Sequence, residues 1–272
     1  IWDNKNLHTI TPTLYDHKVS GTSAVITHNT ANTSAQLEIG TVDGTLAKRQ
    51  TMRYFTYAPG TSQYISFTSI FNAGKTGLRQ RAGYYDVDNG LFFQVSGTTL
   101  SVVRRTNTSG SVVDNATAQS AWNQDKMDGT GPSKVTLDTT KNNIYYIDFQ
   151  WLSAGQIRWA VDVKGVPHFV HIEDFTNTEA NPYMSSPTLP LRYEIENIAT
   201  TASASALQDI CHSVKSEGGK VVLGRHYATG TGATVVAVTT RRPILAIRLK
   251  TSFGGVNNKI AIDFLKMTIR TT

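Results

Sequence analysis

The chain has 272 residues, 39% of them hydrophobic and only 17% charged, with a formal net charge of +6. This length suits one large or two small domains, and the abundance of Thr, Ser, Asn and Gly without Leu-, Glu- or Lys-rich stretches is typical of a β-rich protein. The single cysteine, Cys211, excludes an intrachain disulfide and a cysteine-based zinc site, and no apolar run is long enough to predict a membrane span.

The N-terminal segment, residues 1–25, carries apolar side chains without a strong strand rhythm. We expect it to be an arm that reaches a neighbouring subunit, followed by one β-domain over residues 26–272. Because the sequence opens on Ile1 rather than Met, we also expect a processed or longer precursor. The residues of the arm that we predict to make assembly contacts are Trp2, Leu7, Ile10, Leu14 and Tyr15.

Alternating apolar and polar residues predict a series of strands from residue 62 onward. In residues 62–71, Ile65 and Phe67 alternate with Ser66 and Thr68. Two dipeptides, Asn89-Gly90 and Lys164-Gly165, suit the positive backbone angles of two-residue hairpin turns, so we expect neighbouring strands to be antiparallel. The other strands predicted in this way are 78–87, 91–95, 100–105, 143–152, 156–163 and 166–175.

The aromatic residues of the segment 143–175 suit the core between two packed sheets. They are Tyr145, Phe149, Trp151, Trp159 and Phe169. The expected fold is therefore an all-β antiparallel sandwich of two sheets, of jelly-roll type.

Two other segments are less regular, and a further pair of strands is predicted near the end of the sequence. Residues 105–143 lack a regular strand rhythm, so we expect them to project from the sandwich as an ordered excursion. Long loops of this kind often carry function. Residues 200–219 contain a capping-box pattern, yet Ile210, His212 and Val214 alternate, which favours a strand over a helix. Residues 242–250 and 258–270 predict a final pair of strands.

Two acidic segments raise the question of cation binding. From Asp86, the spacing of a calcium loop fails, because the glycine arrives at the fifth position and the twelfth position is Gly97. We interpret this segment as a hairpin turn, with weak cation binding by Asp86 and Asp88 as the alternative. The same two interpretations apply to Asp125 and Asp128.

Other catalytic and metal patterns are weak. His168 and His171 are three apart and should face opposite sides of a strand, so they should not share a metal ion. Motifs for a serine nucleophile, a phosphate loop or a dinucleotide site do not occur. The carboxylates that could supply a glycosidase pair are Glu173, Asp174, Glu194 and Glu196, but acidic residues at strand ends are usually solvated. We therefore predict no catalytic residue, no cofactor and no metal.

Arginines occur in short clusters that alternation distributes over different faces. Arg79 and Arg81 should share a face, whereas Arg104 and Arg105 should split across two. Since most aromatics alternate as core residues, this pattern favours solvated faces or subunit salt bridges over a nucleic-acid groove. We include Arg104 and Arg105 among the predicted assembly contacts.

The middle of the chain, about residues 50 to 220, resembles a family of β-sandwich structural proteins of virus particles, notably of marine tailed phages and large DNA viruses. The segments that carry the resemblance are 78–106, 122–163, 189–197 and 210–219. The resemblance implies a virion component without enzymatic activity.

Together these observations predict a non-enzymatic virion structural protein, located in a capsid, vertex or appendage, that assembles with copies of itself and other virion proteins. The alternative is a carbohydrate-binding or receptor-binding fibre or spike head that holds a host-surface glycan. The second alternative is a glycoside hydrolase.

Overall fold

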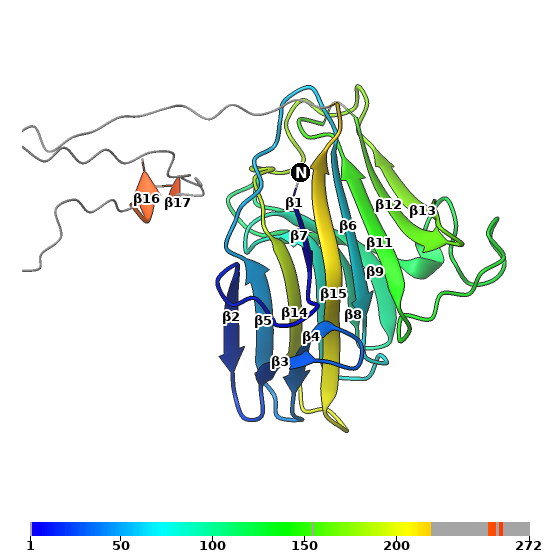
Figure 1. Ribbon diagram of the computed structural model, residues 1–272. Coiled ribbons are helices and arrows are strands. Elements are labelled where there is room, and N and C mark those ends of the chain that lie inside the picture. The colour runs from blue at the N-terminus through cyan, green and yellow to red at the C-terminus, as the bar shows by residue number, and fades with distance from the viewer. Residues whose placement is uncertain (1, 154, 219–249, 254–255, 258–272) are drawn as a thin grey trace, which may run out of the picture. The chain divides into compact units, whose positions relative to one another are not determined.

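The computed structural model describes residues 2–153, 155–218, 250–253 and 256–257. The chain divides into two units, residues 1–220 and 221–272. The first unit is an antiparallel sandwich of two sheets (Figure 1), so the predicted fold class is confirmed. In the second unit, β16 (Ser252–Phe253) pairs with β17 (Val256–Asn257). The strands predicted over residues 242–250 and 258–270 lie almost entirely outside the described residues.

The first sheet, sheet A, has eight strands in the order β13-β12-β11-β6-β15-β4-β3, with β1 paired to β15. Its central strand pairs join segments far apart in the sequence, and Trp2 lies opposite Val214. The strands are β1 (Trp2–Lys5), β3 (Val25–Asn29), β4 (Ser34–Ile39), β6 (Gln63–Ile70), β11 (Asn143–Phe149), β12 (Gln156–Val163), β13 (Val166–Asp174) and β15 (Ser205–Ser216).

The second sheet, sheet B, has seven strands in the order β10-β9-β8-β7-β14-β5-β2. The strands are β2 (Tyr15–Ser20), β5 (Leu46–Thr51), β7 (Leu78–Tyr85), β8 (Gly90–Ser96), β9 (Thr99–Thr106), β10 (Val113–Ala118) and β14 (Leu191–Asn197). The segment expected as an N-terminal arm thus contributes β1 to sheet A and β2 to sheet B.

The core lies between the sheets and follows the alternation seen in the sequence. In β6, Ile65 and Phe67 are buried while Ser66 and Thr68 are only half-buried. Phe67 packs against Phe93 of β8 across the two sheets, with ring centroids 6.2 Å apart. Each strand therefore has one inward face in the core and one outward face on which a site can form.

The turns agree with the sequence at one of the two predicted positions. Lys164 and Gly165 form the two-residue hairpin between β12 and β13, with φ of 56° and 86°. Between β7 and β8 the loop has four residues, 86–89, because Tyr85 pairs with Gly90. The Asp86 carboxylate accepts hydrogen bonds from the backbone N–H groups of Asp88 and Asn89, which fixes this longer turn.

The irregular segments are ordered by the core. Residues 205–216 form a strand, as alternation predicted. The segment 105–143 contains β10 and a short 3-10 helix, η1 (Gln119–Ala121), and it buries Trp122 and Met127 in the core. Among the described residues, no helix has the length and apolar character needed to cross a membrane.

Candidate functional site

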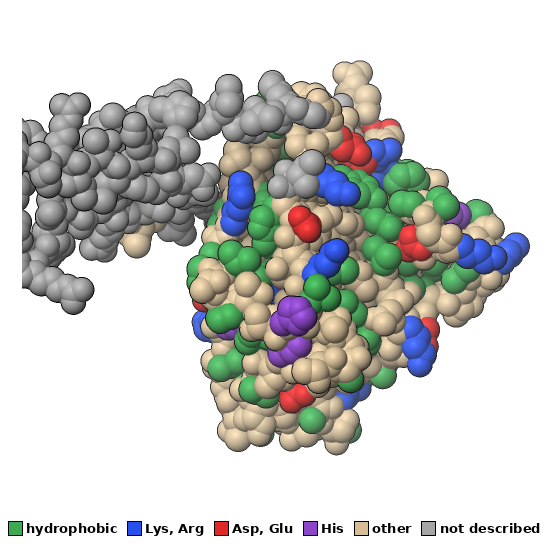
Figure 2. All heavy atoms as spheres, in the orientation of Figure 1, with side chains coloured by type: hydrophobic (Ala, Val, Ile, Leu, Met, Phe, Trp, Pro, Cys, Tyr) green, Lys and Arg blue, Asp and Glu red, His purple; other side chains and the backbone are tan. Residues whose placement is uncertain are grey.

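The candidate site is a pocket of about 290 Å³ on the outward face of sheet A, which we call the aromatic pocket. Figure 2 shows hydrophobic side chains gathered over the β11–β13 part of this face, with charged side chains among them. Its volume is close to the lower end of the range for small-molecule sites. It is lined by Tyr64, Tyr146, Asp148, Arg158, Ala160, Pro167, Phe169 and Glu217.

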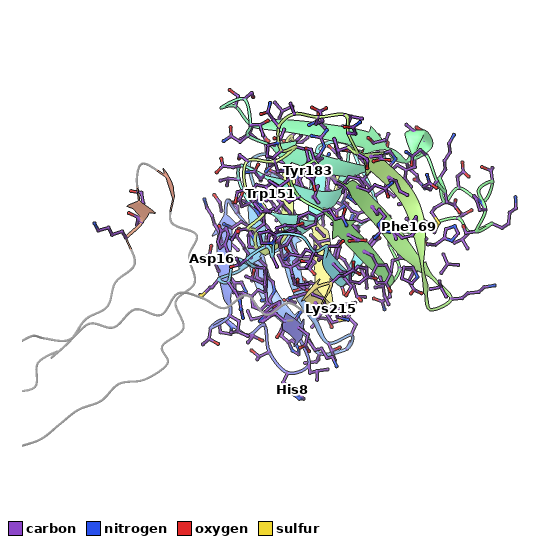
Figure 3. All side chains as sticks on the ribbon, turned by 90° about the horizontal axis from the view of Figure 1, so that it is seen from above. His8, Asp16, Trp151, Phe169, Tyr183 and Lys215 are labelled. Carbon is purple, nitrogen blue, oxygen red and sulfur yellow. The ribbon has the colours of Figure 1, made fainter. Side chains whose placement is uncertain are left out.

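Strand register brings these side chains together. Asp148 of β11 lies opposite both Tyr64 of β6 and Arg158 of β12, and Tyr146 lies opposite Ala160. Because side chains alternate along each strand, all of these residues point away from the core. Ala160 is the smallest of them, so the pocket is hollow above it. In Figure 3, the labels on Phe169 of β13 and Lys215 of β15 bracket the strands that carry the pocket.

A bulge in β13 turns Phe169 outward. The register between β12 and β13 shifts at Trp159 and Ala160, so Phe169 lies opposite Ala160 while His171 lies opposite the buried Trp159. Phe169 is 39% exposed. The prediction that Phe169 belongs to the core is therefore wrong, because simple alternation does not include the extra residue.

The same bulge corrects the prediction for the two histidines. His168 lies opposite Val161 and His171 opposite Trp159, so both pair with inward-facing residues rather than facing opposite sides. Their contacts differ: His168 Nε2 lies 2.9 Å from an Asp125 oxygen, and His171 packs on the Trp159 ring.

Two carboxyl groups in the aromatic pocket have different environments, and we call them the carboxyl pair, Asp148 and Glu217. Asp148 is only 5% exposed, and its Oδ1 has no hydrogen-bond partner, while Oδ2 is paired with Arg158. Burial raises the pKa of Asp148 above its usual value; Arg158 opposes this shift and the Glu217 charge adds to it. Glu217 follows β15, is exposed, and is anchored by its N–H, which donates to the Ser62 carbonyl.

The aromatic walls are held by polar contacts. The Tyr64 and Tyr146 rings lie 5.6 Å apart, and the Tyr146 hydroxyl donates to Asp162 at 3.0 Å. Burial raises the pKa of Tyr146 to about 12, so its hydroxyl stays protonated at neutral pH. The Arg158 guanidinium lies 5.2 Å from the centre of the Phe169 ring. The pocket thus combines ring faces, hydroxyl groups and two carboxyl groups, which suits a polyhydroxylated ligand.

The carboxylates considered from the sequence are not brought together as a free pair. Glu173 binds Arg104, Glu194 lies between Arg81 and Arg192, and Glu196 binds Arg79. The exposed Asp174 accepts a hydrogen bond from the Thr176 N–H. Sequence reasoning missed Asp148 and Glu217, although Asp148 stands at an outward position between the core residues Ile147 and Phe149.

The carboxylates of the acidic turns accept hydrogen bonds from backbone N–H groups. Asp125 accepts hydrogen bonds from the N–H groups of Met127 and Ser133, and Asp128 from that of Thr130. Asp86 and Asp88 lie in the β7–β8 loop, where Asp88 also accepts from Asn107. Within residues 2–153, 155–218, 250–253 and 256–257, no three His, Cys, Asp or Glu side chains lie close enough together to hold one metal ion.

The predicted assembly contacts lie in different environments. Trp2 stacks on His212, and Tyr15 is buried at 2% exposure. Leu7 and Leu14 are exposed, and Ile10 is half-buried. Arg104 and Arg105 do split across two faces: Arg104 binds Glu173 of sheet A, and Arg105 binds Asp114 of β10. Their role in assembly stays a prediction.

No family model and no curated protein matches the chain. Among solved structures, a glycosyl hydrolase family protein from Mycobacterium fortuitum aligns at 10% identity and a TM-score of 0.50, over 79% of this chain and 99% of that one. A glycoside hydrolase family protein from Mycobacterium thermorestibile aligns at 11% identity and a TM-score of 0.50, with the same coverage. A protein of unknown function from Shewanella oneidensis MR-1 aligns at 9% identity and a TM-score of 0.50, over 83% and 88%. At these identities the likeness shows the fold.

These matches correct two predictions made from the sequence, the virion structural role and the absence of enzymatic activity. Two of the three structures, which share the fold along 99% of their length, are glycoside hydrolase family proteins. Glycoside hydrolase was the second alternative predicted from the sequence.

Proposed function

We propose that the protein is a glycoside hydrolase that binds sugar in the aromatic pocket and acts through the carboxyl pair. One observation carries the proposal: a buried carboxyl with a raised pKa, Asp148, and an exposed carboxylate, Glu217, line the same aromatic pocket. Pairs of carboxyl groups whose environments push their pKa values apart are the usual basis for dividing acid and base roles.

The roles of the two groups follow from their environments. Asp148, which holds its proton to higher pH, would donate that proton from Oδ1 to the glycosidic oxygen as the bond to the anomeric carbon breaks. Glu217 would act on the anomeric carbon, either directly or by taking a proton from the attacking water. Water then supplies the hydroxyl of the new reducing end. If Glu217 attacks directly, the covalent bond to Glu217 is broken by this water, and Asp148 takes the proton that the water releases. If Glu217 acts as the base, it takes that proton and passes it to solvent, from which Asp148 is protonated again.

The walls of the pocket supply binding. The exposed Phe169 ring offers an apolar face against which a sugar ring can stack, and Tyr64 and Tyr146 line the same pocket. The shared fold of the two mycobacterial glycoside hydrolases supports the same class of activity.

The test is the release of reducing ends from a panel of neutral polysaccharides by the full chain. We expect Asp148→Asn and Glu217→Gln each to lower the rate by about 100-fold or more, since positioned acid–base groups contribute about 10² to 10⁴. Glu179→Gln is the matched control, because Glu179 is an exposed carboxylate that does not line the pocket. Activity that survives both substitutions at the wild-type rate would refute the assignment.

A second candidate, sugar binding without cleavage, is favoured by the ion pair between Arg158 and Asp148, which opposes protonation of the acid. It corresponds to the carbohydrate-binding alternative predicted from the sequence. Binding of an oligosaccharide that Phe169→Ala removes, together with no product from any polysaccharide, would select this candidate over hydrolysis.

A further inference from the structure

The outward face of sheet B, on the other side of the core from the aromatic pocket, carries a second concentration of functional groups. Two aromatic rings, Tyr85 of β7 and Phe92 of β8, lie against each other with centroids 4.5 Å apart. Gly90 makes room for them: a Cβ there would lie 2.0 Å from the Tyr85 Cβ. Both rings are fully buried although they face away from the core, so other side chains cover them.

Arginines provide this cover. The Arg105 guanidinium lies 5.4 Å from the centre of the Phe92 ring, and that of Arg192 lies 5.1 Å from the centre of the Tyr85 ring. The Arg81 guanidinium lies 5.7 Å from the Phe92 ring centre. We call Arg81, Arg105, Arg192 and Tyr85 the arginine cluster.

The charges of this face do not balance. The ion pairs on it join four arginines to three carboxylates, because Glu194 is shared by Arg81 and Arg192. The other two carboxylates, Asp114 and Glu196, bind Arg105 and Arg79. Arg81 also lies 3.7 Å from Asp114 and 3.6 Å from Glu196. The excess of positive charge also affects the neighbouring Lys48, whose pKa is lowered first by burial and then by the Arg192 charge. The face therefore favours a further negative charge.

Two donors of the arginine cluster have no acceptor. The Tyr85 hydroxyl is fully buried without a hydrogen-bond partner, and so is the Nε–H of Arg192, whose residue is 8% exposed. Burial raises the pKa of the Tyr85 hydroxyl, so it remains a donor and cannot serve as the anion itself. Buried donors normally have partners, and beside an excess positive charge an acceptor that carries negative charge is favoured over a neutral one.

We propose that the arginine cluster is a binding site for an oxyanion, a carboxylate or sulfate group held by the Tyr85 hydroxyl and the Arg192 Nε–H. The planar guanidinium suits such groups because its parallel N–H donors match their oxygens. The rim of the cluster reaches solvent at Asp114 and Glu196, whose side chains are 30% and 21% exposed. The oxyanion can belong to an acidic sugar or be a free inorganic anion, and the two sources share this chemistry.

The test is calorimetric titration of the full chain with sulfate, glucuronate and glucose at constant ionic strength, because salt screens such contacts. We expect binding of sulfate or glucuronate and none of glucose. Tyr85→Phe, which removes only the hydroxyl oxygen, should weaken that binding tenfold or more, and Arg192→Lys, which keeps the charge but removes the Nε–H, should do the same. Tyr146→Phe, in the aromatic pocket, should leave it unchanged.

Each result has one meaning. Glucuronate that binds more tightly than sulfate identifies an acidic sugar as the ligand, and equal binding identifies the oxyanion alone. The proposal is overturned if neither oxyanion binds, if glucose binds as well as glucuronate, or if both variants bind as the wild type does. Because the readout is binding at the arginine cluster, it does not depend on hydrolysis in the aromatic pocket.

Discussion

Asp209 is expected to be the carboxylate on which the stability of the sandwich depends most. It is fully buried between the sheets, and it accepts a hydrogen bond from the Arg49 Nε at 2.9 Å and lies 2.9 Å from the His212 Nδ1. Arg49, also fully buried, donates further to the Asn6 side chain. Asp209→Asn removes the charge without changing the shape, and leaves the Arg49 charge buried without a counterion.

The cost can be worked from this geometry. Breaking a buried ion pair costs about 3–5 kcal/mol, which lowers the midpoint of urea unfolding by about 1.5–2.5 M if the slope is about 2 kcal/mol per M. The assay is urea unfolding followed by tryptophan fluorescence, with Asp174→Asn as the control, since Asp174 is an exposed carboxylate. A loss below about 1 kcal/mol at an unchanged slope would refute the reasoning that the pair is desolvated.

The pH dependence gives a second readout of the same residue. Hydrogen bonds and charges from His212 and Arg49 hold the pKa of Asp209 well below its usual range, against the effect of burial. A carboxyl whose folded pKa is depressed stabilises the fold above its unfolded pKa of about 3.9, and this contribution is lost as the pH falls toward the folded pKa. We therefore expect Asp209→Asn to flatten the decline of stability below about pH 4.

Three further predictions follow from the site and the sheets. If Asp148 is the acid, activity should fall as the pH rises through its raised pKa. Glu217→Gln removes a charge that raises this pKa, so the remaining activity of the variant should fall at a lower pH than that of the wild type; an unchanged pH of decline would contradict the interaction between the two carboxyl groups. Phe169→Ala should abolish oligosaccharide binding in titrations but change the free energy of unfolding by about 1 kcal/mol or less, because the ring is exposed; a larger loss of stability would show that it supports the fold. Gly90→Ala should destabilise the fold by more than about 1 kcal/mol, since the added Cβ would lie 2.0 Å from the Tyr85 Cβ; an unchanged thermal unfolding temperature would contradict the packing.

The sandwich was predictable from the sequence because period-two alternation and hairpin glycines are local signals. β6 and the meander β11–β13 follow directly from them. The orientation of Phe169 was not predicted, because a bulge adds one residue. Pro167 is compatible with an edge strand as well as with a bulge, so it does not by itself locate the extra residue. Local pattern thus gives the strands but not every face.

The aromatic pocket was less accessible to sequence reasoning because it depends on register between distant strands. Tyr64 and Asp148 are cross-strand neighbours although more than eighty positions separate them in the sequence. Burial of Asp148 and its pairing with Arg158 are properties of that register, and no local pattern reports them. The carboxylates that the sequence did single out, such as Glu194, are instead neutralised by arginines on neighbouring strands.

The pairing of β1 with β15 has a consequence for how the sandwich is made in the cell. Trp2 and Val214 are partners, so this part of sheet A cannot close until some 210 residues of the chain have left the ribosome. Until then β15 is absent, and the edges of β6 and β4 that it will cover stay unpaired. Such delayed, long-range closure predicts slow folding and a period during synthesis in which the unpaired edges are open to aggregation.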